Sequence, residues 1–271
     1  MLRGDFHVHT NISPCAQEEA TVENFLAECQ KAKLTAIGFS NHLWDQEAKP
    51  IGAEEWYSNC TLSKVLTLKN QLPKEKNGVR IYFGCETDIH ADGTIALTQE
   101  HAKCFDYVLI AMSHYHIPLT VGNVDINNAQ VMKPIAMKRF VLACNADFEV
   151  PTCICHPFLP CGVKNIEEHL RHFSDEDYLK CFSLAKKKGV AIELSSAFID
   201  RRPSKYAHFD ESGFVFEYVR LMKAAQRSGV KIQLGSDAHS LDQFHVHEEM
   251  IRFAQVCGIA ENELVSEIRC K

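Results

Sequence analysis

The chain of 271 residues lacks several features that would place it in a specialised class. It has no excess of basic residues: the formal net charge is -6, so there is no electrostatic footprint for nucleic acid, and we expect no nucleic-acid partner. It has no long apolar segment near its N-terminus, so we expect neither a signal peptide nor a membrane span. We find no repeat, low-complexity linker or shift in composition. With 46% hydrophobic residues, the chain can bury a large core, and we expect one domain over residues 1–271.

A disulfide framework is not expected, although the chain has twelve cysteines. In a chain of this length without a secretion signal, buried and reduced thiols in the cytosol are the better interpretation, so we expect a cytoplasmic protein. The closest pair is Cys153 and Cys155, in an apolar run. We expect their side chains to face opposite sides of a strand and interpret both as core residues rather than as joint metal ligands.

Short apolar strands alternate with amphipathic helices along the chain. We expect strands near residues 5–10, 35–40, 79–84, 107–112, 150–155, 190–194 and 230–234. We expect helices from near residue 21, over 53–72, and over 99–104, 134–146, 174–188, 213–228 and 246–257. The polar segment 117–131 has the character of an insertion or a lid loop. The alternation predicts an α/β fold with parallel strands linked by crossover helices.

The first of these strands carries two histidines, His7 and His9, which alternate with Phe6 and Val8. Residues two apart in a strand point to the same side, so both imidazoles can face one point. Two neutral imidazoles that converge in this way could begin a zinc, manganese or iron site. Taken alone, the pattern fits two surface histidines on an edge strand equally well.

Further ligand-type residues recur where the strands end, and this favours the metal site. The set consists of His7, His9, His42, Glu86, His114, His156, Glu193, Asp237 and His239. Ligands bind at the carboxyl ends of the strands in barrels and open α/β sheets alike. A set of imidazoles and carboxylates with no required thiolate suits Zn²⁺, Mn²⁺ or Fe²⁺ and argues against a closed Cys₄ zinc site.

The set is larger than one ion needs, which suggests several ions that share a bridging carboxylate, with Glu86 as the natural bridge. Two ions about 3.5–4 Å apart can hold a hydroxide between them and stabilise both the attacking and the leaving oxygen. The chemistry that matches best is hydrolysis of a phosphoester, because the metals neutralise the phosphoryl oxygens and no covalent nucleophile is needed.

Six blocks resemble, in order, the PHP (polymerase and histidinol phosphatase) family. They are His7-Val8-His9-Thr10, Gly38-Phe39-Ser40-Asn41-His42, Gly84-Cys85-Glu86-Thr87-Asp88, Ser113-His114, Cys155-His156-Pro157 and Gly235-Ser236-Asp237-Ala238-His239. The resemblance spans nearly the whole chain. It implies a distorted (β/α)7 barrel with two or three divalent metal ions (zinc, manganese or iron).

The resemblance also implies a distribution of the ligands over three metals. The first set is His7, His9, Glu86 and Asp237; the second is Glu86, His114 and His156; the third contains His42 and His239. Related phosphatases often place another histidine at the third metal, where a gapless reading puts Cys15. A thiolate binds zinc or iron well but is prone to oxidation. Cys15 is therefore either a substitute ligand or a bystander, with Glu18 as a nearby competitor.

Other polar residues have two readings. Asp5 is expected to orient a ligating histidine, and Asp88 either does the same or ends a strand. Glu193 and Ser195 are candidates for direct contact with the substrate. Three basic residues could clamp a phosphate or belong to a solvated loop, namely Arg201, Arg202 and Lys205.

The remaining histidines outside the six blocks are expected to be mostly exposed. His116 is a proton donor, a lid residue or an exposed loop histidine. His169 with His172, and His245 with His247, are interpreted as solvated. Trp44 either lines the mouth of the pocket or packs in the core.

The predicted function is hydrolysis of a small phosphomonoester by a metal-bridging hydroxide, with Glu86, Asp237 and His239 as catalytic residues. Histidinol phosphate is the leading substrate by family and chain length. The alternatives are a phosphodiesterase or nucleotide phosphatase with the same metals, or a non-catalytic metal-binding regulatory module. The sequence does not predict the identity of the metal or the oligomeric state.

Overall fold

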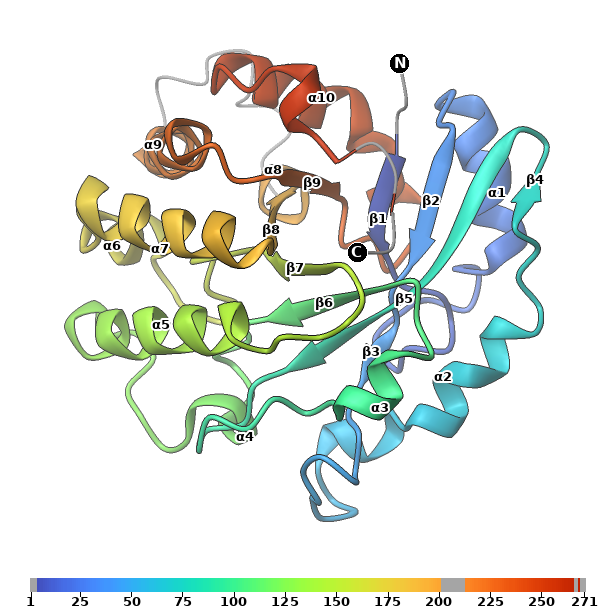
Figure 1. The fold of residues 1–271 in the computed structure, drawn as a ribbon, viewed down its shortest axis with the longest axis horizontal. Coiled ribbons are helices and arrows are strands. Elements are labelled where there is room, and N and C mark those ends of the chain that lie inside the picture. Colours follow the sequence, from blue (N-terminus) through green and yellow to red (C-terminus); the bar gives the residue numbers. More distant parts are fainter. Residues whose placement is uncertain (1–3, 201–212, 266–267, 269–271) are drawn as a thin grey trace.

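The structure, a computed structural model, describes residues 4–200, 213–265 and 268. Within these residues, parallel strands pair side by side in one row (Figure 1). In the order of the row they are β1 (Gly4–Val8), β2 (Ala36–Phe39), β5 (Val79–Asp88), β6 (Tyr107–Ala111), β7 (Thr152–Cys155), β8 (Ala191–Ser195) and β9 (Ile232–Gly235).

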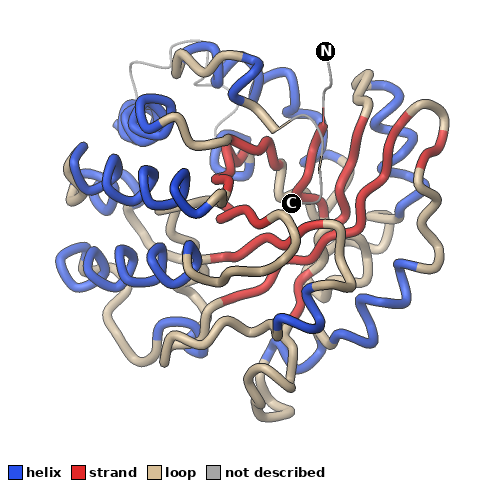
Figure 2. Tube along the Cα trace, viewed as in Figure 1, coloured by secondary structure: helices blue, strands red, loops and turns tan. Residues whose placement is uncertain are grey.

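The two ends of this row meet. The N–H of His9 donates to the carbonyl oxygen of Ala238 at 2.9 Å, and the N–H of Asp237 donates to that of His7 at 2.8 Å. A parallel bridge between Val8 and Ala238 lies at the same place. The sheet is therefore nearly closed into a barrel, with the strands at the centre and the helices around them (Figure 2).

Strand β5 is longer than its neighbours and organises one side of the barrel. Its first half pairs with β2, and its second half pairs with the short strand β3 (His42–Leu43), where His42 lies opposite Glu86. A second short strand, β4 (Glu75–Lys76), pairs with β5 in the antiparallel sense. The length of β5 thus carries Glu86 to the carboxyl end of the barrel beside His42.

The helices are α1 (Val22–Lys31), α2 (Leu62–Lys69), α3 (Gln99–Ala102), α4 (Pro118–Val121), α5 (Ala129–Cys144), α6 (Ile166–Arg171), α7 (Asp175–Lys188), α8 (Ala197–Asp200), α9 (Gly213–Ser228) and α10 (His247–Val256). Local signals set their ends. The side chain of Ser174 caps α7 and forms a reciprocal capping box with Asp177, while Gly189 ends the helix in a left-handed conformation at φ 70°. None of the helices in the described residues has the length and apolar character that crossing a bilayer requires.

The predicted parallel α/β barrel is confirmed, with local corrections. The expected helix over 53–72 is wrong in part, because it divides into a 3-10 turn at Trp56–Asn59 and helix α2, which begins where the side chain of Thr61 accepts a bond from the N–H of Lys64. The polar segment 117–131 contains α4, and α5 begins before Pro134, after an N-cap at Asn128.

Residues that point into the barrel form a small apolar cluster of their own. It contains Phe6, Ala36, Tyr107, Leu109, Ala111, Cys153 and Cys155. The expectation that Cys153 and Cys155 face opposite sides is wrong, because residues two apart in a strand share a face. Their interpretation as buried core residues is confirmed. At the base of this interior, the hydroxyl of Tyr107 donates to the carbonyl oxygen of Phe6 at 2.8 Å.

We expect that adding a methyl group at Gly84 destabilises the barrel. A Cβ at this position collides with the ring of buried Tyr107. Gly84→Ala should lower the free energy of unfolding by about 1–3 kcal/mol, measured by urea denaturation. Gly52→Ala is the matched control, because its Cβ meets only the flexible carboxylate of Glu54, and its expected effect is below about 0.5 kcal/mol. Equal stability of the two variants would contradict this packing.

Candidate metal centre

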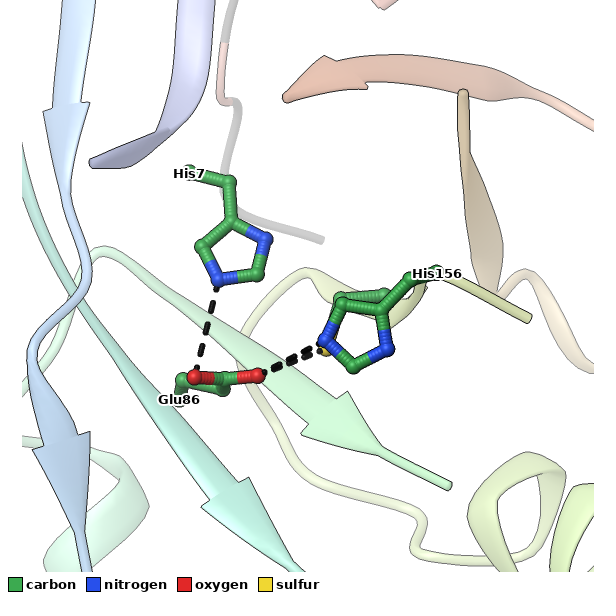
Figure 3. A group of neighbouring side chains, drawn as sticks. His7, Glu86 and His156 are labelled. Carbon is green, nitrogen blue, oxygen red and sulfur yellow. Dashed lines mark hydrogen bonds and ion pairs between the residues drawn. The ribbon is translucent and has the colours of Figure 1, made fainter. Parts of the chain in front are cut away.

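The carboxylate of Glu86 lies at the centre of a group of imidazoles at the carboxyl end of the barrel (Figure 3). Oε2 of Glu86 is 2.7 Å from Nδ1 of His42, 3.4 Å from Nε2 of His9 and 3.6 Å from Nε2 of His7. Oε1 is 3.1 Å from Nε2 of His156 and 3.6 Å from Nε2 of His114. These residues come from different strand ends, and all are buried. The structure therefore brings the predicted ligand residues of five strands together.

Asp237 and His239, which follow β9, complete this group on the side nearer to solvent. Oδ1 of Asp237 is 3.3 Å from Nε2 of His7 and 3.2 Å from Nε2 of His9. The ring of His239 stacks on that of His9, with centroids 4.1 Å apart. The side chains of Asp237 and His239 are 16% and 22% exposed, so a ligand in solution can reach them.

In most of these histidines, the nitrogen that faces away from the cluster is held by a hydrogen bond. Nδ1 of His7 lies 2.7 Å from Oε1 of Glu193, and Nδ1 of His114 lies 2.7 Å from Oδ2 of Asp88. The corresponding partners are Ser13 for His9, Ser113 for His156 and the carbonyl oxygen of Asp237 for His239. Because these contacts fix the ring orientation, Nε2 of each ring is presented to the cluster, as in metal sites generally.

The donor set fits divalent cations. Nε2 of His7 and Nε2 of His9 lie only 3.1 Å apart. Oε2 of Glu86 and Nδ1 of His42 are in contact at 2.7 Å but without hydrogen-bond geometry, and neither has a hydrogen-bond partner among the described residues. Nitrogen and oxygen atoms that converge in this way are the donor set that a cation requires. Four groups of possible ligands have their atoms within 4.8 Å of one another. They are His7, His9, Glu86 and Asp237; His9, His42 and His239; His7, Glu86, Cys155 and His156; and His114, His156 and Cys161.

In the metal-free cluster, the pKa values of the neighbouring groups are shifted in different directions. Burial acts to raise the pKa of Glu86, but the imidazoles of His42 and His7 hold it well below its usual range. Burial lowers the pKa of His9 far below its usual range, and the neighbouring His239 and His42 act in the same direction. For His114, burial is outweighed by the charges of Glu86 and Asp88, which raise its pKa to about 9. Cations must therefore displace a proton from His114, whereas His9 is already neutral.

The structure shows how the residues around the cluster act. Asp5 accepts hydrogen bonds from the N–H groups of His7 (3.1 Å) and Ser236 (3.0 Å), so it ties β1 to the loop after β9 rather than orienting an imidazole. Glu193 and Ser195 are fully buried, which contradicts direct contact with the substrate. Glu193 instead holds the ring of His7, and its Oε2 accepts a bond from the N–H of His156 at 2.8 Å.

Asp88 orients His114 and belongs to a buried network that we did not predict. Its Oδ2 also accepts a bond from the hydroxyl of Tyr57 at 2.8 Å, and its Oδ1 accepts one from the guanidinium of Arg139 at 2.9 Å. Arg139 lies on α5 and also donates to the carbonyl oxygens of Ile89, Met112 and Thr120. No motif in the sequence marks Arg139. Ser113 stands in one of the six blocks, but its contact with His156 was not predicted.

Several predicted site residues lie outside the cluster or outside the described residues. Arg201, Arg202 and Lys205 lie outside the described residues, as do the side chains of His245 and His247. Cys15 is exposed and belongs to none of the four groups. Desolvation of its thiol, and after it the charges of Glu86 and Asp237, raise the pKa of Cys15 to about 12. Its role as a ligand, and that of exposed Glu18, remains a prediction.

The burial of three further side chains can be compared with what the sequence predicts for them. The expectation of a solvated His169 is wrong, because it is buried against Tyr115 and Phe173. Trp44 is fully buried and donates to the carbonyl oxygen of Lys49 at 2.7 Å, which favours the packing role. His116 is exposed, with its ring 5.7 Å from that of His114.

The barrel of parallel strands and the imidazoles and carboxylates at its carboxyl end define an α/β barrel protein with a candidate centre for several metal ions. The model of the PHP domain family matches residues 5–197. The chain therefore belongs to the PHP domain family, as its six sequence blocks predict.

Proteins similar to this chain carry related names. A probable phosphatase of Syntrophotalea carbinolica is 24% identical over 263 residues, which cover 97% of this chain and 90% of that protein. A probable phosphatase of Caldicellulosiruptor bescii is 23% identical over 239 residues, which cover 88% and 80% of the two chains.

Two solved structures share the fold. The histidinol phosphate phosphatase of Lactococcus lactis, complexed with zinc, L-histidinol and phosphate, has a TM-score of 0.64 and 20% identity, with 99% of this chain and 100% of that chain covered. The putative histidinol phosphatase of Listeria monocytogenes has a TM-score of 0.61 and 14% identity, with 89% and 97% covered. Both confirm the predicted barrel.

We expect that Asp88→Asn weakens metal binding, because the amide no longer holds His114 with a charged acceptor. Loss of such an outer partner typically costs 10–100-fold in affinity, so we expect a decrease of about 10–100-fold, measured by competition with a chromophoric chelator. Asp45→Asn is the matched control. Asp45 is also buried and lies 2.7 Å from Nδ1 of His101, but that histidine is outside the cluster. Equal losses in both variants would contradict a specific role for Asp88.

We expect Asp5 to make the metal-free protein less stable as the pH rises. Burial raises the pKa of Asp5 from its ordinary value of 3.8 to about 6. Between these values the folded state keeps a proton that the unfolded state releases, so the stabilising effect of the neutral form is lost as the pH rises through this window. From about pH 4 to pH 7, the wild type should lose about 2 kcal/mol of unfolding free energy relative to Asp5→Asn. Parallel pH profiles in chemical denaturation would contradict this.

Proposed function

We propose that this protein is a metal-dependent phosphatase that hydrolyses small phosphomonoesters, with histidinol phosphate as the leading substrate. The observation that carries the proposal is the position of Glu86, a buried carboxylate surrounded by imidazoles, and in most of these the opposite nitrogen is already held by a hydrogen bond. The names of the similar proteins support the reaction class, and the Lactococcus lactis structure with L-histidinol and phosphate supports the choice of substrate.

Two or three divalent ions are proposed to occupy the cluster. His7, His9, Glu86 and Asp237 would hold the first. Glu86, His114 and His156 would hold the second, and His42 with His239 would hold the third, joined by Cys15 or His9. Zinc is the leading candidate because it is present in the Lactococcus lactis structure, and manganese and iron suit the same donors. When bound, such ions activate water and neutralise phosphoryl oxygens.

The chain's own residues would prepare this chemistry. Glu86 provides one oxygen to the histidines on each side of it, so it can join two ligand sets. Asp237 is placed at the accessible side of the cluster, where its carboxylate can accept a hydrogen bond from the attacking water. The carbonyl oxygen of Asp237 lies 2.8 Å from Nδ1 of His239, which keeps that nitrogen protonated and leaves the Nε2 lone pair for the cluster.

We also propose contacts and a location that the described residues do not test. Arg201, Arg202 and Lys205 would bind the phosphate through charge-assisted hydrogen bonds. Residues 1–271 would form one barrel domain. A cytoplasmic location is supported by the cysteines of the described residues, all of which are free thiols.

The proposal is tested by removing and restoring the metal. The purified protein should contain zinc, manganese or iron by elemental analysis, and chelation should abolish release of inorganic phosphate from histidinol phosphate until the metal is added back. Glu86→Gln should lower kcat/KM by at least about 100-fold, more than loss of an outer partner does. Glu217→Gln is the matched control, because Glu217 is a buried carboxylate paired with Arg220 on α9, outside the cluster.

The substrate panel separates the alternatives. Rates on histidinol phosphate, nucleoside monophosphates and a phosphodiester are compared under the same metal. A higher rate on the diester or on the nucleotides would contradict the proposed substrate class and would favour a phosphodiesterase or a nucleotide phosphatase. Metal binding without turnover of any phosphoester would overturn the phosphatase and favour a metal-binding regulatory module.

A further inference from the structure

Two cysteine sulfur atoms lie beside the cluster although no cysteine at those positions was expected to bind metal. One belongs to Cys155 at the end of β7, and the other to Cys161 in the loop that follows. We propose that Cys161 is a thiolate ligand of the metal held by His114 and His156. The inference rests on metal binding by this cluster but not on the identity of the substrate.

The loop after β7 places Cys161 by a series of backbone contacts. It turns sharply at His156 and Phe158, whose φ angles are 32° and 61°. The N–H of Leu159 donates to the carbonyl oxygen of His156 at 3.1 Å, and the buried side chains of Phe158 and Leu159 anchor the turn in the core. The N–H of Cys161 then donates to the carbonyl oxygen of Ser113 at 2.9 Å. Cys161 is thus tied to the residue that directly precedes His114.

The sulfur and the two imidazoles have the spacing of a shared site. Sγ of Cys161 and one nitrogen each of His114 and His156 lie within 4.8 Å of one another. With Zn–S at about 2.3 Å and Zn–N at about 2.0–2.1 Å, the ligand atoms of one tetrahedral zinc ion lie about 3.3–3.6 Å apart, so the three atoms need to approach one another by at most about 1.5 Å. The two rings are held from behind by Asp88 and Ser113, so a small shift of the Cys161 side chain is sufficient to close the site.

Cys155 and Cys15 are placed for different roles. Cys155 directs its thiol at Oε1 of Glu86, with a sulfur-to-oxygen distance of 3.3 Å, and lies in the apolar interior of the barrel beside Phe6 and Leu109. It is a hydrogen-bond donor to the central carboxylate. Cys15 is exposed and belongs to none of the four ligand groups. Cys161 is therefore the thiol that shares a group of possible ligands with both histidines of the second metal set.

A thiolate at this position has consequences for the metal. Thiolates favour zinc and iron(II) over manganese, which prefers oxygen donors, so Cys161 would bias the second ion toward a soft metal. Binding must release the thiol proton. In the metal-free protein the half-buried Cys161 is open to reagents in solution, whereas a bound ion would shield it.

Cobalt substitution tests the proposal on the full-length protein. Co²⁺ bound by a thiolate gives a near-ultraviolet sulfur-to-cobalt charge-transfer band that nitrogen and oxygen ligands do not give. We expect this band in the cobalt-loaded wild type, its loss in Cys161→Ser, and its retention in Cys15→Ser. Cys104→Ser is the matched control, since Cys104 is half-buried like Cys161 but outside the four groups, and it should retain the band.

A second measurement uses the unaltered chain and does not depend on the folding of a variant. Iodoacetamide labelling followed by peptide mass spectrometry should show that Cys161 is modified in the metal-free protein. After zinc is added, the extent of labelling should fall at least about 10-fold, since even outer partners change metal affinity by 10–100-fold. Cys104 should be labelled equally in both states.

The outcomes separate this inference from the proposed function. A band that persists in Cys161→Ser and disappears in Cys15→Ser would overturn the assignment in favour of Cys15. Cobalt binding without any charge-transfer band, together with metal-dependent phosphate release, would overturn the thiolate and leave the phosphatase intact. Absence of metal binding altogether would end both proposals.

Discussion

The structure depends on one constraint: the nitrogen and oxygen atoms of a buried carboxylate and several imidazoles converge, and few hydrogen bonds join them. Five histidines place a ring nitrogen within 3.6 Å of the oxygens of Glu86. Such a set is costly to bury unless cations fill it. The barrel is the device that holds it together, since each strand contributes one or two ligand-type residues at its carboxyl end, and no local segment could assemble the set alone.

The outer contacts show how this rigidity is distributed. Glu193 links β8 to His7 and to the backbone of His156, so one side chain aligns residues from two other strands. Arg139 has a similar role beside His114, where it joins Asp88 to the carbonyl oxygens of three segments. Buried polar groups of this kind are stable because every strong donor has a partner. The site is therefore anchored in the sheet and in α5.

The sequence predicts the barrel and the central residues because both follow local rules. Alternation marks His7 and His9 in a strand, and ligand-type residues after the apolar runs mark the remaining members of the cluster. What it does not predict depends on contacts between distant segments. Neither the helical position of Arg139 nor the apolar strand around Glu193 indicates a role at His114 or His7. Buried His169 was missed because its charged neighbours resemble those of a solvated helix. Cys161 was missed because its place depends on the path of a loop.

The closure of the barrel has a consequence for how the protein is made. Its first strand joins its last through the hydrogen bonds between His9 and Ala238 and between Asp237 and His7. Contacts this distant in sequence form late and slowly during folding. A nascent chain emerging from the ribosome carries His7 and His9 long before Asp237 and His239 exist, so the cluster stays incomplete until the last strand of the barrel has been made. Binding of metal by the full ligand set thus has to follow synthesis of the whole barrel, and metal supply at that moment becomes part of the biogenesis of the protein.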